Sequence, residues 1–128
     1  MCRQQAMTKV LVIEDEEILR ESILDILKIR GFSAIGAGDG YRGLQLAKEF
    51  APDLILCDVR MPKLDGYQVL QAIRKDSLTA TIPLIFLTAE TLQNVVDKGQ
   101  ILGANGYLTK PFTTAQLLEA IAQGLRDR

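Results

Sequence analysis

The chain of 128 residues contains no histidine, and this absence excludes several kinds of chemistry. Ser-His-Asp and Cys-His nucleophilic sites, HExxH metal sites and a phosphohistidine intermediate all need an imidazole. Any reaction on this chain must therefore use carboxylates, lysine, hydroxyl groups or a hard metal ion.

Cysteine is scarce, and long apolar runs are missing. Cys2 lies in a polar start and Cys57 in an apolar segment, so we expect two free thiols rather than a disulfide framework. No apolar run approaches the ~20 residues needed to cross a bilayer. The first residues also lack the apolar core of a signal peptide. We therefore expect a cytoplasmic location without membrane contact.

Neither sign of charge is in excess, because 15 Lys and Arg are balanced by 16 Asp and Glu. The basic residues are scattered, which provides no electrostatic footprint for nucleic acid, and direct binding to it is not expected. With 48% hydrophobic residues, the composition and length indicate one compact globular domain.

Short apolar runs alternate with amphipathic segments along the chain. Between the runs, apolar residues recur at helical spacing, as from Ile18 to Leu27. This alternation predicts an α/β domain in which a (βα) unit occurs five times, as a parallel sheet with helices on both faces. In such sheets ligands bind beyond the carboxyl ends of the strands. The expected strands are 9–13, 33–37, 54–57, 83–87 and 106–109.

Polar side chains stand at the carboxyl ends of four expected strands: Glu14 and Asp15, then Asp58, Thr88 and Lys110. Three neighbouring carboxylates repel one another, and one lysine offsets one charge at most. Oxygen ligands favour a hard ion such as Mg²⁺, which keeps open positions for phosphate oxygens. The edge therefore predicts a site for Mg²⁺ and a phosphoryl group, with Asp58 as the nucleophile that forms an aspartyl phosphate.

Taken alone, each residue has a structural explanation. Acids after a strand and Thr88 can cap the following helix, and a lysine before a proline is usually a solvated surface residue. Tyr107 alone is a strand aromatic with its hydroxyl in water. The joint occurrence of these residues at strand ends, in this order, favours the functional interpretation.

Four segments resemble the receiver domain of two-component response regulators, and the resemblance covers about residues 8–126. It implies a single doubly wound, flavodoxin-like (βα)5 domain with strand order 2-1-3-4-5. Residues 8–128 would form the receiver and residues 1–7 a disordered extension. The segments are VLVIEDEE, PDLILCDVRMPKLDGYQVL, IPLIFLTAE and GANGYLTKPF.

The resemblance implies a role for each matching residue. Asp58 matches the phosphoacceptor, and Thr88 matches the hydroxyl that follows the phosphoryl group. Lys110 matches the phosphate-binding lysine, joined to Pro111 by a cis bond. Tyr107 matches the aromatic switch residue that turns inward when Thr88 moves.

The resemblance also implies a metal site for Mg²⁺, with Mn²⁺ as an alternative ion. Asp15 and Asp58 would bind the ion directly, together with the backbone carbonyl of Arg60. Glu14 would act largely through metal-bound water. The family more often has an aspartate there, but glutamate is a common variant, and its longer side chain still suits this role. Arg60 and Glu90 occupy variable positions that tune the acyl-phosphate lifetime in the family.

By resemblance, the phosphoryl donor is a histidine kinase or a phosphotransfer protein, acting in trans because this chain lacks histidine. The protein would be a signalling receiver rather than an enzyme, although it would assist its own phosphoryl transfer and autodephosphorylation. The fourth helix, fifth strand and fifth helix would form the switching face. Its target would be a downstream protein, a covalently linked output domain outside this chain, or a second copy in a phosphorylation-dependent homodimer.

Three alternatives remain. A nucleotide- or flavin-binding protein is disfavoured because GAGDG (36–40) lacks the GxGxxG spacing and follows the second strand. A metal-dependent phosphatase would need a further acid–base group near Asp58 and a cap over the substrate. A phosphorylation-independent interaction module would be expected to have lost Asp58, Asp15 or Lys110, and all three are present.

Overall fold

The computed structural model describes residues 7–127, except for the side chains of residues 92, 95 and 99–101. Cys2 and most of the expected extension 1–7 lie outside the described residues, as do the side chains of these five residues in the fourth helical segment. Cys57 is a buried free thiol, as expected. None of the helices in the described part of the chain is long and apolar enough to cross a membrane.

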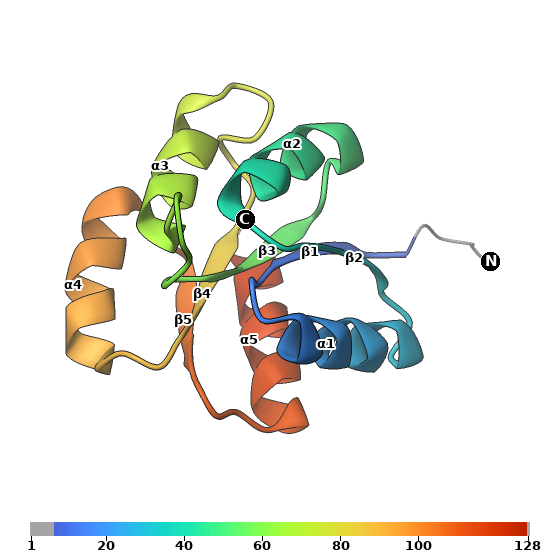
Figure 1. Ribbon diagram of the computed structural model, residues 1–128. Helices are drawn as coiled ribbons and strands as arrows, with labels where there is room; N and C mark the ends of the chain where they lie inside the picture. The colour runs from blue at the N-terminus through green and yellow to red at the C-terminus, as the bar shows by residue number, and fades with distance from the viewer. Residues whose placement is uncertain (1–6, 128) are drawn as a thin grey trace.

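Five parallel strands form one sheet between two layers of helices (Figure 1). The order β2-β1-β3-β4-β5 confirms the doubly wound α/β fold. The strands are β1 (Lys9–Ile13), β2 (Ser33–Ala37), β3 (Leu54–Asp58), β4 (Leu84–Thr88) and β5 (Gly106–Thr109). The helices are α1 (Glu17–Ile29), α2 (Gly40–Phe50), α3 (Gly66–Lys75), α4 (Leu92–Leu102) and α5 (Thr114–Arg126).

The strands are apolar throughout because helices cover both faces of the sheet. Alternate side chains of each strand enter different cores. Leu11, Ile55 and Phe86 pack on the side of α2 and α3, whereas Val10 and Leu56 pack on the side of α1 and α5. The helix α4 lies at the edge of the molecule, beside α3 and β5 (Figure 1).

Two strands end one residue later than the apolar runs predict. Asp58 is the last residue of β3 and pairs with Leu87 of β4. The fourth strand was expected at 83–87, but β4 runs Leu84–Thr88, because Pro83 has no N–H to donate to the ladder. Asp58 and Thr88 are therefore held by the sheet itself rather than by the loops that follow it.

The start of α3 lies directly against the end of β3. The N–H of Gly66 donates to the carbonyl of Val59 at 2.8 Å. A Cβ on Gly66 would fall against the Asp58 carbonyl oxygen and 2.8 Å from the Cα of Val59. Asp65 and Gln68 form a capping box at the start of the helix, so Asp65 has the turn role expected for it. Glycine at position 66 lets the helix approach the strand that carries Asp58.

We predict that Gly66→Ala lowers the free energy of unfolding by about 1–3 kcal/mol, because the added methyl group meets backbone atoms that cannot move aside. Urea unfolding followed by circular dichroism would measure the loss. Gly106→Ala is the matched control, since its Cβ would lie 3.5 Å from the Ile85 side chain. An equal loss in both variants would contradict the steric explanation.

Candidate functional site

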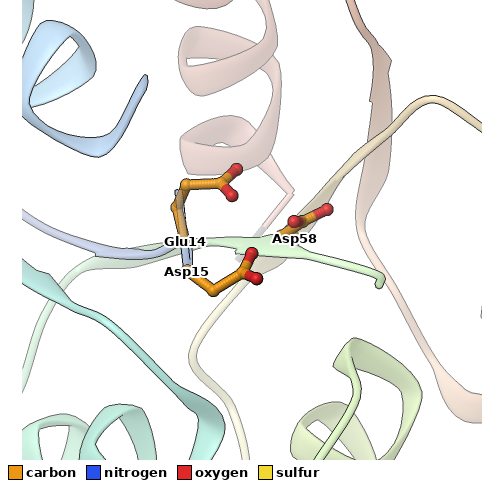
Figure 2. A group of neighbouring side chains, drawn as sticks. All are labelled: Glu14, Asp15 and Asp58. Atoms are coloured by element: carbon orange, nitrogen blue, oxygen red, sulfur yellow. The ribbon is translucent and has the colours of Figure 1, made fainter. Parts of the chain in front are cut away.

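Three carboxylates gather where β1 and β3 end (Figure 2). Glu14 and Asp15 follow β1 directly, and Asp58 ends β3. One carboxylate oxygen of each lies within 4.8 Å of the others. Glu14 and Asp58 are only 1% and 5% exposed, whereas Asp15 is open to solvent. A cluster of oxygen ligands with one accessible side suits a hard divalent cation.

Lys110, directly after β5, brings a positive charge to this cluster. Its Nζ lies 2.9 Å from Oε1 of Glu14 and 3.3 Å from Oδ1 of Asp58. Its N–H donates to the Thr88 carbonyl at 2.7 Å, and the Lys110–Pro111 bond is cis. Burial alone would lower the pKa of Lys110, but the hydrogen bond to Glu14 and the charges of Asp58 and Glu14 raise it overall. The ammonium group therefore stays charged at neutral pH.

Both carboxylate oxygens of Glu14 have protein partners. Oε1 accepts from Lys110, and Oε2 accepts from the N–H of Glu16 at 3.1 Å. The Glu14 carbonyl accepts from the Arg20 guanidinium at 2.7 Å, a contact that no spacing in the sequence predicts. Glu14 is thus held in place, while Asp15 is the more accessible acid.

Asp58 is difficult to ionise in this environment. Burial, followed by the charge of Glu14, raises its pKa from 3.8 to about 7, although Lys110 acts in the opposite direction. One lysine therefore does not offset both the burial of Asp58 and the negative charge of Glu14. A divalent cation would remove this excess of negative charge, so the residues present fit Mg²⁺.

Thr88 ends β4 on the strand next to Asp58, and it is 1% exposed. Its hydroxyl accepts from the N–H of Glu90 at 2.9 Å. The hydroxyl thus binds the turn after β4, while α4 begins only at Leu92. The Thr88 hydroxyl is therefore bonded to the Glu90 N–H, and it lies at the same edge of the sheet as Lys110.

Tyr107 connects β5 to α4. Its ring centroid lies 6.1 Å from that of Phe86 in β4. Its hydroxyl donates to the carbonyl of Val96 at 3.4 Å. Burial raises the pKa of Tyr107, so the hydroxyl remains protonated at neutral pH.

A hollow of about 340 Å³ adjoins Asp58, Lys110 and Ala89. Arg60 and Glu90 also line it, and Nη2 of Arg60 lies 2.7 Å from Oε2 of Glu90. The sequence indicates a role for both positions but does not predict their ion pair, because the pair depends on the paths of long side chains from separate segments. It indicates no role for Tyr67 or Lys98, which line a neighbouring cavity.

Asp58 makes the stability of the metal-free protein depend on pH. Its pKa is about 7 in the folded state and near 3.8 when unperturbed, so the folded state binds more protons between these values. The free energy of unfolding must therefore fall as pH rises from about 4 to about 7. Below both values Asp58 is protonated in either state and contributes no difference.

We predict that Asp58→Asn in EDTA raises the free energy of unfolding at pH 8 by roughly 2–4 kcal/mol. Urea titrations from pH 4 to pH 8 should show a gain that shrinks toward acid pH. If the free energies of unfolding of wild type and Asp58→Asn changed with pH in parallel, the pH dependence could not come from Asp58.

Comparison with known proteins agrees with this fold. The family model described as the response regulator receiver domain matches residues 10–122. The chain therefore belongs to the response regulator receiver family, and the expected resemblance is confirmed. Receiver domains of two-component systems are phosphorylated by kinases and bind Mg²⁺ at an acidic pocket.

Curated relatives are similar over most of this chain. The DNA-binding dual master transcriptional regulator RpaA of Synechocystis is 38% identical over 122 residues, covering 94% of this chain and 50% of that protein. Protein PilG of Pseudomonas aeruginosa is 38% identical over 113 residues, covering 88% of this chain and 84% of PilG. The chain spans about half the length of RpaA and of two other curated transcriptional regulators that it matches.

Solved structures of receivers have the same fold. Chemotaxis protein CheY4 of Vibrio cholerae has a TM-score of 0.88 and 33% identity, covering 92% of this chain and 98% of CheY4. The receiver domain of sensor histidine kinase PA1611 from Pseudomonas aeruginosa has a TM-score of 0.85 and 31% identity, covering 94% and 99%. That domain is described with a magnesium ion coordinated in its active site cleft.

Proposed function

We propose that Asp58 is the phosphoacceptor of this receiver and takes a phosphoryl group from a histidine kinase or phosphotransfer protein in the cytoplasm. The observation that carries the proposal is the position of its carboxylate. It ends β3 within a cluster of three acids, 3.3 Å from the Lys110 ammonium, beside a hollow of about 340 Å³. The receiver unit spans residues 8–128.

The acidic cluster is the proposed Mg²⁺ site, with Mn²⁺ as an alternative ion. Asp15, Asp58 and the Arg60 carbonyl would bind the ion directly. Glu14 would act through metal-bound water, which its existing bonds to Lys110 and Glu16 support. When bound, the ion neutralises the carboxylates and the charge on the phosphoryl oxygens.

The residues of the chain have separate roles in the transfer. The Asp58 carboxylate forms the new bond to phosphorus while the bond between phosphorus and the donor nitrogen breaks. Lys110, which is charged and already next to Asp58, neutralises a phosphoryl oxygen. The same groups assist the later attack of water on the acyl phosphate. The protein therefore acts as a signalling receiver that limits the lifetime of its own acyl phosphate.

The proposed switch begins at Thr88. Its hydroxyl would leave the Glu90 N–H and bind the phosphoryl group, which opens space for the Tyr107 ring to turn inward. Tyr107 would then release the Val96 carbonyl and alter the face formed by α4, β5 and α5. That face would act on a downstream protein, on an output domain outside this chain or on a second copy of the receiver.

We predict that acetyl phosphate with Mg²⁺ adds one phosphoryl group to the protein, as measured by intact mass. Asp58→Asn should gain none, because it lacks the nucleophilic carboxylate. Asp65→Asn is the matched control, since this acid caps α3 from the same loop and asparagine is an equally good cap. Equal labelling of wild type and Asp58→Asn would refute the assignment. An unlabelled wild type would favour the phosphorylation-independent module.

Mg²⁺ should stabilise the folded protein, because the folded state alone assembles the three acids. At about ten times its Kd, the ion should raise the free energy of unfolding by about 1.4 kcal/mol. Asp15→Asn should weaken the dependence on Mg²⁺ in urea titrations, whereas Asp25→Asn, an exposed acid on α1, should retain it. A dependence that is unchanged in Asp15→Asn would place the ion elsewhere.

A further inference from the structure

A second cavity, of about 460 Å³, adjoins the hollow beside Asp58. It is lined by the loop after β3, the first turn of α3, the turn before α4 and one residue of α4 itself. Arg60 and Glu90 line both spaces, and Tyr67 of α3 and Lys98 of α4 line the second one. The Arg60–Glu90 ion pair therefore stands at the boundary between the proposed phosphorylation site and the α3–α4 groove.

Two buried polar atoms at this second cavity have no hydrogen-bond partner among the residues that the structure describes. They are the Tyr67 hydroxyl and Oε1 of Glu90. The other carboxylate oxygen of Glu90 is bound to Arg60 at 2.7 Å. Leaving a buried hydroxyl and a carboxylate oxygen unpaired is unfavourable, so a state in which they bond to each other has a clear energetic advantage.

The Tyr67 ring is held in place by its neighbours. It packs edge-on against Phe86, with 5.3 Å between centroids, and Nζ of Lys98 lies 5.2 Å above it. Burial, and then the charge of Glu90, raise the pKa of Tyr67, so its hydroxyl keeps the proton that it could donate. Tyr67 is thus a donor with a well-packed ring, and it lines the same cavity as a carboxylate that has an unpaired oxygen.

We propose that Glu90 has two alternative partners: Arg60 in the unphosphorylated protein and the Tyr67 hydroxyl in the phosphorylated protein. This inference rests on the proposed phosphorylation of Asp58. A phosphoryl group adds negative charge and acceptor oxygens to the hollow that Arg60 and Glu90 line. The guanidinium then binds the phosphoryl oxygens, while the Glu90 carboxylate is repelled and accepts a hydrogen bond from Tyr67.

Tyr67 is therefore a positioning residue that acts on the phosphoryl group through Glu90. Its bond to Glu90 removes an acid from the rim of the hollow and leaves Arg60 free for the phosphoryl group. It also joins α3 to the turn before α4, next to Lys98. This contact differs from the one between Tyr107 and Val96, but it is linked to Thr88, whose hydroxyl binds the Glu90 N–H, and Phe86 packs against both tyrosines.

The chain has three tyrosines, so protein containing 3-fluorotyrosine should give three ¹⁹F resonances that Tyr→Phe variants can assign. With acetyl phosphate and Mg²⁺, we expect the Tyr67 resonance to shift, while that of exposed Tyr41 stays in place. In Glu90→Ala, compared at the same phosphorylated fraction, the Tyr67 shift should be lost.

Intact mass measured on the same samples separates two kinds of failure. No gain of a phosphoryl group would overturn both the proposed function and this inference. A gain of the group with an unmoved Tyr67 resonance would overturn this inference alone. A Tyr67 shift that persists in Glu90→Ala would do the same, because the partner would then be another group, such as a bound water.

A double-mutant cycle tests the energetic link between the two residues. Tyr67→Phe keeps the ring and removes only the hydroxyl. At a fixed donor concentration it should lower the ratio of phosphorylated to unphosphorylated protein by roughly three- to tenfold, as expected for one hydrogen bond. Tyr41→Phe should leave this ratio unchanged. In the Glu90→Ala background Tyr67→Phe should have no further effect, and an equal effect in both backgrounds would overturn the inference.

Discussion

The bonds from Lys110 to Glu14 and Asp58 allow two buried acids to coexist at one edge of the sheet. Burial and the charge of Glu14 together outweigh the effect of Lys110 and raise the pKa of Asp58 to about 7. We therefore expect the metal-free protein at neutral pH to be less stable than it would be with a neutral residue at this position. This loss of stability has a use, since the remaining negative charge favours binding of a cation. Stability and function oppose each other at this residue, as they commonly do at active sites.

Secondary structure places these groups more firmly than loops could. Parallel strands end at a common edge, so residues far apart in the chain become neighbours without any long connection. Asp58 and Thr88 belong to the ladder between β3 and β4, and the N–H of Lys110 is bound to the Thr88 carbonyl. The loops carry the side chains that are less firmly placed. They carry Arg60 and Glu90, whose side chains can change partners while the sheet remains as it is.

The sequence predicts the fold well, because burial on both faces of a parallel sheet leaves an unmistakable series of apolar runs. It also predicts which side chains meet, since they occupy the residues where those runs end. The apolar run 83–87 predicts the start and end of β4 one residue too early, because Pro83 is apolar but has no N–H to donate to the ladder. The sequence does not predict the Arg60–Glu90 ion pair or the contact from Arg20 to the Glu14 carbonyl. They depend on the paths of long side chains from separate segments, which no spacing in the sequence encodes.

The bond between Lys110 and Glu14 joins residues that lie 96 positions apart. During synthesis on the ribosome, Glu14, Asp15 and Asp58 emerge long before the lysine that neutralises them. A nascent chain therefore carries these carboxylates without the ammonium group that lies next to Glu14 and Asp58 in the folded protein. The site is assembled only when β1 and β5 occupy the same sheet. A half-made or partly unfolded chain would thus lack the site, and the proposed response to a kinase would be confined to the finished fold.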